Sequence, residues 1–132
     1  MDANRSLSRP TDEDANNPFV ADCPGRTLFN HLTTRWSVLL MLALVDGAMR
    51  FHELRDRVGG ISEKMLSQTL KTLARDGLVR RLPEATVPPR VSYELTPLGM
   101  EVAAPLGEVA RWVERRIPEV LVAQRSFDAG EP

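Results

Sequence analysis

The stretch that decides the fold is residues 51–99, FHELRDRVGG ISEKMLSQTL KTLARDGLVR RLPEATVPPR VSYELTPLG. Apolar residues at i, i+3 and i+7 from Phe51 predict a short helix that ends at two consecutive glycines. A serine that suits a helix cap then begins a longer helix, residues 62–76. Two β-prone segments, 78–82 and 90–95, follow and are joined by a proline-containing loop. Two helices followed by a hairpin predict a winged helix-turn-helix, mainly α with a small β-hairpin wing.

The helix at 62–76 has a polar face that suits DNA. At roughly 100° per residue, its polar side chains fall opposite Leu66, Leu70 and Leu73. Lysine approaches guanine acceptors or phosphate, glutamine pairs with adenine, and serine serves either. The alternative is a solvated helix face that binds no ligand. The residues predicted to bind DNA are Ser62, Lys64, Met65, Ser67, Gln68, Lys71 and Arg75 on this helix, with Arg80 and Arg90 on the hairpin.

Three of these residues have a second expected role or an alternative. Ser62 is expected both to cap the helix and to donate to a phosphate, because the first turn of the helix points its free N–H groups at the DNA backbone. Met65 lies about 100° from the polar face, which favours packing over contact with a thymine methyl group. Arg90 is expected to contact phosphate or the minor groove, with an ion pair to Glu94 as the alternative.

Positive charge is concentrated in this region. Between residues 61 and 90 six basic residues outnumber three acidic ones, whereas the whole chain has a formal net charge of −1. The basic residues are Lys64, Lys71, Arg75, Arg80, Arg81 and Arg90, and the acidic ones are Glu63, Asp76 and Glu84. Such a separation of charge favours a nucleic-acid partner.

Length and composition exclude several classes of protein. A chain of 132 residues, 42% hydrophobic and 27% charged, fits one compact domain with tails. The longest apolar run, residues 38–45, is far below the roughly 20 residues that span a bilayer, so we expect no membrane partner and a cytoplasmic location. One cysteine and two histidines, His31 and His52, offer no metal-ligand spacing and no catalytic constellation. We therefore expect no metal, no cofactor and no enzymatic activity.

The remaining segments divide the chain into three parts. Residues 1–22 are rich in Asn, Asp, Ser and Pro and lack apolar periodicity, which predicts a disordered acidic leader. The domain is expected at 23–122, and 123–132 are expected to be a flexible tail. Within the domain, helices are predicted at 24–32 and 35–45. The second is apolar on nearly every side and should form the buried centre.

A terminal helix is predicted to start at Thr96-Pro97. Apolar residues recur along it as far as Ile117, and Pro105 and Pro118 are expected to kink or split it. This stripe could pack on its own domain or on a second copy of the chain. A small domain gains most by burying a long stripe against its twin, so we favour a homodimer that pairs through terminal helices. The expected interface residues are Val102, Leu106, Val109, Trp112 and Val113.

Cys23 precedes a predicted helix start. The positive end of the helix and Arg26, three residues later, could stabilise its thiolate and make it a redox sensor. The alternative is a small buried apolar residue that only packs.

Several motifs together resemble the HxlR-type winged helix-turn-helix regulators of bacteria, from Cys23 to about Trp112. The resemblance rests on Cys23-Pro24, Trp36, Gly47, residues 50–54, 61–66, 76–79 with Leu73, and 88–99. It implies a homodimer whose recognition helices enter successive major grooves, with wings on the flanking backbone and control of transcription, more often repression. It also implies, in some members, oxidant or electrophile sensing by a cysteine at this position. The chain departs from the pattern at Thr33-Thr34-Arg35, where the family usually has Gly-Gly-Lys or Gly-Asp-Lys.

The leading hypothesis is therefore a dimeric, sequence-specific DNA-binding transcriptional regulator. Its partners would be a double-stranded DNA operator, a second copy of the chain, and an oxidant or small-molecule effector. The alternative is a winged-helix adaptor that binds protein, which would not need the cluster of basic residues on helix and hairpin.

Overall fold

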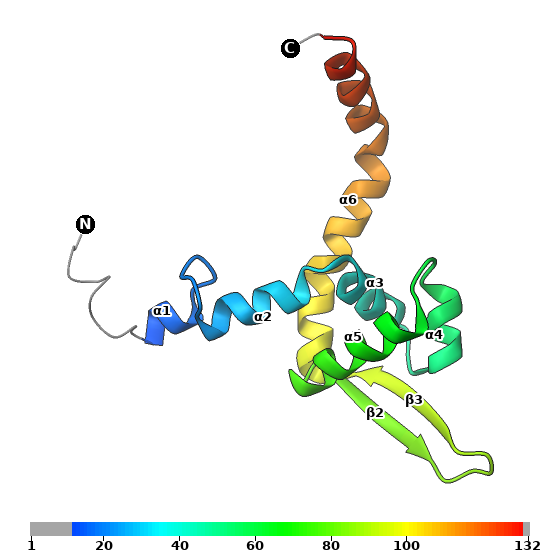
Figure 1. Ribbon diagram of the computed structural model, residues 1–132. Coiled ribbons are helices and arrows are strands. Elements are labelled where there is room, and N and C mark those ends of the chain that lie inside the picture. The colour runs from blue at the N-terminus through cyan, green and yellow to red at the C-terminus, as the bar shows by residue number, and fades with distance from the viewer. Residues whose placement is uncertain (1–11, 131–132) are drawn as a thin grey trace.

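The computed structural model describes residues 12–130 of the chain (Figure 1). Its elements are α1 (Asp12–Asn16), α2 (Pro24–Leu32), α3 (Arg35–Ala43), β1 (Met49–Arg50), α4 (Phe51–Arg57), α5 (Glu63–Arg75), β2 (Val79–Glu84), β3 (Arg90–Leu95) and α6 (Pro97–Asp128). The fold is a winged helix-turn-helix, as predicted, in which α4 and α5 form the helix-turn-helix and β2 and β3 the wing. The sheet has a third strand that was not predicted, because β1 is only two residues long.

The predicted recognition helix is α5, and its ends are fixed by the residues that the sequence indicated. The Ser62 side chain accepts a hydrogen bond from the Met65 backbone N–H at 3.1 Å, which caps the first turn. Gly77, at φ 77°, supplies the left-handed conformation that follows the last turn. On the buried face Leu66, Leu70 and Leu73 join the hydrophobic core, so the opposite face is left to solvent.

The wing is an antiparallel hairpin with β3 in the centre and β2 at the edge of the sheet. β2 extends two residues beyond the predicted segment and includes Pro83. An edge strand tolerates proline because one side of its backbone has no partner strand. Figure 1 shows the hairpin projecting well clear of the helices.

The helix α3 is shorter and less buried than predicted. It ends at Ala43, and only Ser37, Leu40 and Met41 are fully buried, while Leu39 is exposed. The helix does lie in the centre of the core through Leu40 and Met41, but α4, α5 and α6 cover only part of its apolar surface.

The helix α6 is continuous from Pro97 to Asp128, so the predicted split at Pro105 or Pro118 does not occur. Both prolines face solvent, so the backbone hydrogen bonds that they remove leave no buried carbonyl oxygen without a partner. Figure 1 shows that the helix curves along its length instead of breaking. The helix starts tightly against the body, because Gly99 packs directly on the Leu78 carbonyl oxygen. No residue of α6 beyond Gly107 is fully buried.

The predicted boundaries at both ends of the chain need correction. Residues 123–128, expected in a flexible tail, continue α6. In the predicted disordered leader, residues 12–22 form α1 and a turn against α2, whereas residues 1–11 lie outside the described residues. This segment lacks apolar periodicity, and polar contacts order it instead. The Arg26 guanidinium donates hydrogen bonds to the carbonyl oxygens of Pro18 and Phe19. Figure 1 shows α1 and α2 as an arm that leaves the body.

Candidate nucleic-acid interface

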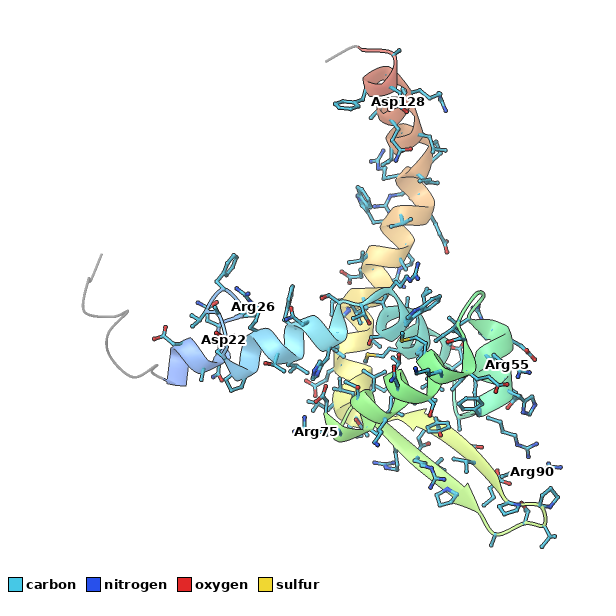
Figure 2. All side chains as sticks on the ribbon, viewed as in Figure 1. Asp22, Arg26, Arg55, Arg75, Arg90 and Asp128 are labelled. Atoms are coloured by element: carbon cyan, nitrogen blue, oxygen red, sulfur yellow. The ribbon has the colours of Figure 1, made fainter. Side chains whose placement is uncertain are left out.

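The exposed face of α5 collects the polar residues that the sequence predicted. The side chains opposite the buried leucines are all exposed, and we call them the reading face: Lys64, Ser67, Gln68, Lys71 and Arg75. Figure 2 shows Arg75 at the C-terminal end of the helix. Three positive charges and two hydrogen-bonding side chains on one helix face can meet phosphates and base edges in a major groove. Their contacts with bases stay a prediction.

Two residues at the start of α5 have mixed roles. Ser62 performs its predicted capping role, with its oxygen as the acceptor. Met65 is 39% exposed and borders a groove between α5 and the start of α3. The sequence favours packing for Met65, and its side chain is only partly packed. It lies beside the reading face and not at its centre.

On the wing, Glu94 pairs with Arg80, at 2.9 Å between Nη1 and Oε1. The alternative of an Arg90–Glu94 ion pair is therefore wrong. The strand register explains the choice, because Arg80 lies directly across from Glu94, whereas Arg90 lies across from Glu84. Among the described residues, the Arg90 side chain has no ion-pair partner and is exposed on the hairpin (Figure 2). Its charge is free for a phosphate, while that of Arg80 is partly neutralised.

Two side-chain contacts, one of them an ion pair, position α5. Arg55 of α4 pairs with Glu63 in its first turn at 2.5 Å. His31, in the last turn of α2, contacts Asp76, which caps the other end of α5, at 2.6 Å between Nδ1 and Oδ2. Sequence reasoning missed the second pair, because 45 positions separate its partners. Together the pairs link both ends of the recognition helix to neighbouring helices.

The predicted dimer residues divide into two groups. Val102 and Leu106 are half-buried and pack against the core of their own domain, and their role in a dimer interface stays a prediction. Val109, Trp112 and Val113 are 59%, 49% and 46% exposed on the part of α6 that leaves the body. We call these three residues, with the exposed Ile117, the α6 stripe.

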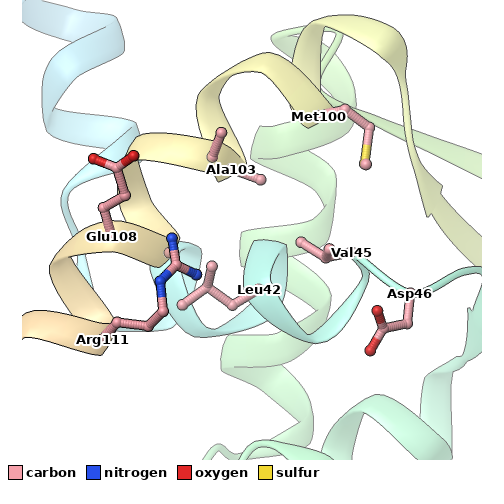
Figure 3. A pocket seen from close by; sticks show the side chains of 9 residues that line it. Leu42, Val45, Asp46, Met100, Ala103, Glu108 and Arg111 are labelled. Atoms are coloured by element: carbon pink, nitrogen blue, oxygen red, sulfur yellow. The ribbon is translucent and has the colours of Figure 1, made fainter. Parts of the chain in front are cut away.

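A groove of about 350 Å³ lies where α6 departs from α3 (Figure 3). Leu42 and Val45 of the α3 side face Met100 and Ala103 of α6, and the Arg111 side chain reaches back toward Leu42.

Cys23 is the N-cap residue of α2 and is only 4% exposed. Its sulfur donates a hydrogen bond to the Asn17 carbonyl oxygen and accepts one from the Arg26 backbone N–H, both at 3.2 Å. The predicted support from the Arg26 charge is not seen, because that guanidinium binds carbonyl oxygens instead. In the reduced protein Cys23 is therefore a buried cap residue.

Two further findings concern metal binding and membrane crossing in the described part of the chain. Residues 12–130 hold no group of three His, Cys, Asp or Glu side chains that could bind a metal ion. Within the same residues no helix combines the length and apolarity needed to cross a bilayer.

Comparison with known proteins agrees with this geometry. The HxlR-like helix-turn-helix family matches residues 31–120. YtfH of Escherichia coli strain K12, named an HTH-type transcriptional regulator, is 44% identical over 119 residues, which cover 90% of this chain and 93% of YtfH. The solved structure of ytfH from Salmonella typhimurium, described as a candidate transcriptional regulator, has a TM-score of 0.79 at 45% identity and covers 83% of this chain and 97% of its own.

A third similar protein is described as a redox regulator. The redox regulator HypR, solved in its oxidised form, has a TM-score of 0.65 at 31% identity and covers 70% of this chain and 96% of its own. Family, relatives and fold agree with the basic reading face on α5. The chain thus belongs to the HxlR-like helix-turn-helix family and is a DNA-binding transcriptional regulator.

Proposed function

We propose that this regulator is a homodimeric, sequence-specific repressor that works by binding DNA and not by catalysis. The observation that carries the proposal is the separation of two surfaces on one protomer. The reading face of α5 is polar and basic, whereas the α6 stripe is apolar and exposed on a helix that leaves the body. The first surface suits a major groove, and the second suits a matching surface on a second copy.

Dimerisation supplies the geometry that specific recognition needs. A single α5 offers few base contacts, and two copies related by a twofold axis would place two reading faces about one helical turn of DNA apart, roughly 34 Å. Repression is the direction of control that the family resemblance favours. Binding to chromosomal DNA would place the protein in the cytoplasm.

Thiol oxidation at Cys23 is the proposed cue. Cys23 lines a groove together with His31, Arg75 and Asp76, so its cap interactions lie beside the C-terminal end of α5. HypR, which has a similar fold, is described as a redox regulator. With one cysteine in the chain, oxidation must join Cys23 to a second subunit or to a small thiol, or convert it to a sulfenic acid. Each product removes the thiol hydrogen that binds Asn17.

Footprinting on the DNA upstream of the protein's own gene tests the proposal. We expect a protected segment with two half-sites about 10 base pairs apart, and reduced transcription from a promoter placed over it. Protection without any sequence preference would contradict specific recognition. Increased transcription would contradict repression and leave DNA binding intact.

A further inference from the structure

A second groove lies along α5, on the edge of the reading face that adjoins the start of α3. Its walls come from Asn30, Thr34 and Arg35 on one side and from Met65, Gln68 and Thr72 of α5 on the other. We call it the α3–α5 groove. Gln68 belongs both to this groove and to the reading face, so the two surfaces are continuous. In Figure 1, α5 lies between the α2–α3 turn and the hairpin, and it contacts both α3 and β2.

Arg35 gives this groove its charge. The Arg35 guanidinium carbon lies 4.4 Å from the centre of the Trp36 ring, and Trp36 packs in turn against the hydrophobic core. Stacking on an aromatic ring orients a guanidinium without neutralising it. No ion pair joins Arg35 to any residue from 12 to 130, and no carboxylate lines the groove. An oriented cation in a groove without acidic residues suits an anionic ligand.

The position of the groove identifies that ligand. A helix that lies in a major groove, about 12 Å wide, has a sugar-phosphate backbone on each side. The wing, with its unpaired Arg90, can hold one backbone. The other backbone would then face the edge of α5 that carries Gln68 and borders Arg35. We propose that Arg35 binds a phosphate of the DNA strand opposite the wing, an inference that rests on the proposed function.

This contact gives the recognition helix a second phosphate anchor. Arg35 and Arg90 would grip the two edges of the major groove, and Gln68 would lie between them with its amide toward the bases. Phosphate contacts set the register of a protein on DNA without carrying sequence information. Arg35 is therefore a positioning residue, and its loss should weaken binding to every duplex by the same factor.

The test compares four variants on two fluorescently labelled duplexes, one from the DNA upstream of the protein's own gene and one of scrambled sequence. Arg35→Gln keeps the side-chain stem over Trp36 and removes the charge, whereas Arg35→Lys keeps the charge. Arg115→Gln is the matched control, since Arg115 is exposed on α6 and lies roughly 160–200° from Val113 and Ile117 around the helix. Lys71→Ala tests the reading face itself.

Affinity is measured by anisotropy over a series of salt concentrations. We expect Arg35→Gln to reduce the slope of log K against log salt by about 0.9 for each subunit bound, on both duplexes alike. Arg35→Lys and Arg115→Gln should keep the wild-type slope. Ethylation interference should show that the phosphates lost in Arg35→Gln differ from those lost in Arg90→Ala and lie across the major groove from them. Melting temperatures check that every variant is folded. If Arg35→Lys keeps the wild-type slope of log K against log salt, the effect of Arg35→Gln comes from the lost charge and not from lost packing.

The outcomes separate this inference from the proposed function. If Lys71→Ala reduces the slope and Arg35→Gln behaves like Arg115→Gln, the phosphate contact is wrong and DNA recognition by α5 stands. If Lys71→Ala and Arg35→Gln both keep the wild-type slope, recognition by α5 fails and the phosphate contact fails with it.

Discussion

Replacing Val109 with aspartate tests whether the α6 stripe is the dimer interface. Val109 is 59% exposed in the protomer and lies beyond Gly107, the last fully buried residue of α6. A carboxylate at this position therefore stays in water while the chain is monomeric, so the substitution should not disturb the protomer. In a twofold interface the same change would bury two carboxylates, one from each copy.

The expected effect is large. Removing an unpaired carboxylate from water costs several kcal/mol in real proteins after relaxation. At about 3 kcal/mol for each of two carboxylates, the dimer would lose roughly 6 kcal/mol, which is about a 10⁴-fold increase in its dissociation constant. A dimer that dissociates in the nanomolar range would then be monomeric at micromolar concentration.

Sedimentation velocity measures this change directly, since the wild type should sediment as a dimer of the 14.7 kDa chain and the variant as a monomer. Arg115→Ala is the control, because it changes the net charge by the same one unit at an exposed position of α6 outside the α6 stripe. Circular dichroism should show unchanged helix content in both variants. A Val109→Asp protein that is folded and remains a dimer with the wild-type dissociation constant would refute the assignment of the interface.

Three further predictions concern other parts of the molecule. Gly99→Ala should lower the melting temperature by about 4 °C or more. The added methyl group would collide with the Leu78 carbonyl oxygen, and overpacking of this kind costs about 1–3 kcal/mol. Gly59→Ala is the control, because Gly59 has open space around it and the variant should melt near the wild type. Gln68→Ala should relax base preference at one position of each half-site by about 1–3 kcal/mol. Arg90→Ala should instead weaken binding to all sequences and reduce the slope of log K against log salt. Competition assays against a panel of single-base operator variants measure both effects, and the reverse pattern would show that the two roles are exchanged. Cys23→Ser should bind its operator with normal affinity and keep binding in diamide or hydrogen peroxide at doses that release the wild type, as followed by anisotropy; equal release of both proteins would remove Cys23 from the redox response.

The recognition helix could be predicted because all of its signals are local. Its cap, its leucine period and its closing glycine lie within 16 consecutive residues, Ser62 to Gly77. Each signal acts through the backbone or through side chains one turn away, so no distant partner is needed. The structure accordingly has Ser62 as the predicted N-cap, and it ends α5 at Arg75 with Asp76 as the C-cap.

Long-range partners could not be predicted in the same way. Val102 and Val109 belong to the same apolar period of one helix, and only the position of the domain core decides that Val102 is partly covered and Val109 is exposed. Glu94 likewise had two arginines within reach in the sequence, and the hairpin register selected Arg80. Arg35 was missed as a site residue because its groove is formed by two helices that are distant in sequence.

The same long-range contacts suggest how a change at Cys23 would reach DNA. The helix α2 is nine residues long and has no fully buried residue, so polar contacts hold much of its position, together with Leu32, which packs against the core. These contacts include the thiol hydrogen bond of Cys23 to Asn17 at its start and the contact of His31 with Asp76 at its end. Because Asp76 caps α5, displacement of α2 by oxidation would act on the end of the recognition helix that carries Arg75. Two reading faces that must match successive major grooves tolerate little displacement, so a shift of one helical arm is enough to weaken binding.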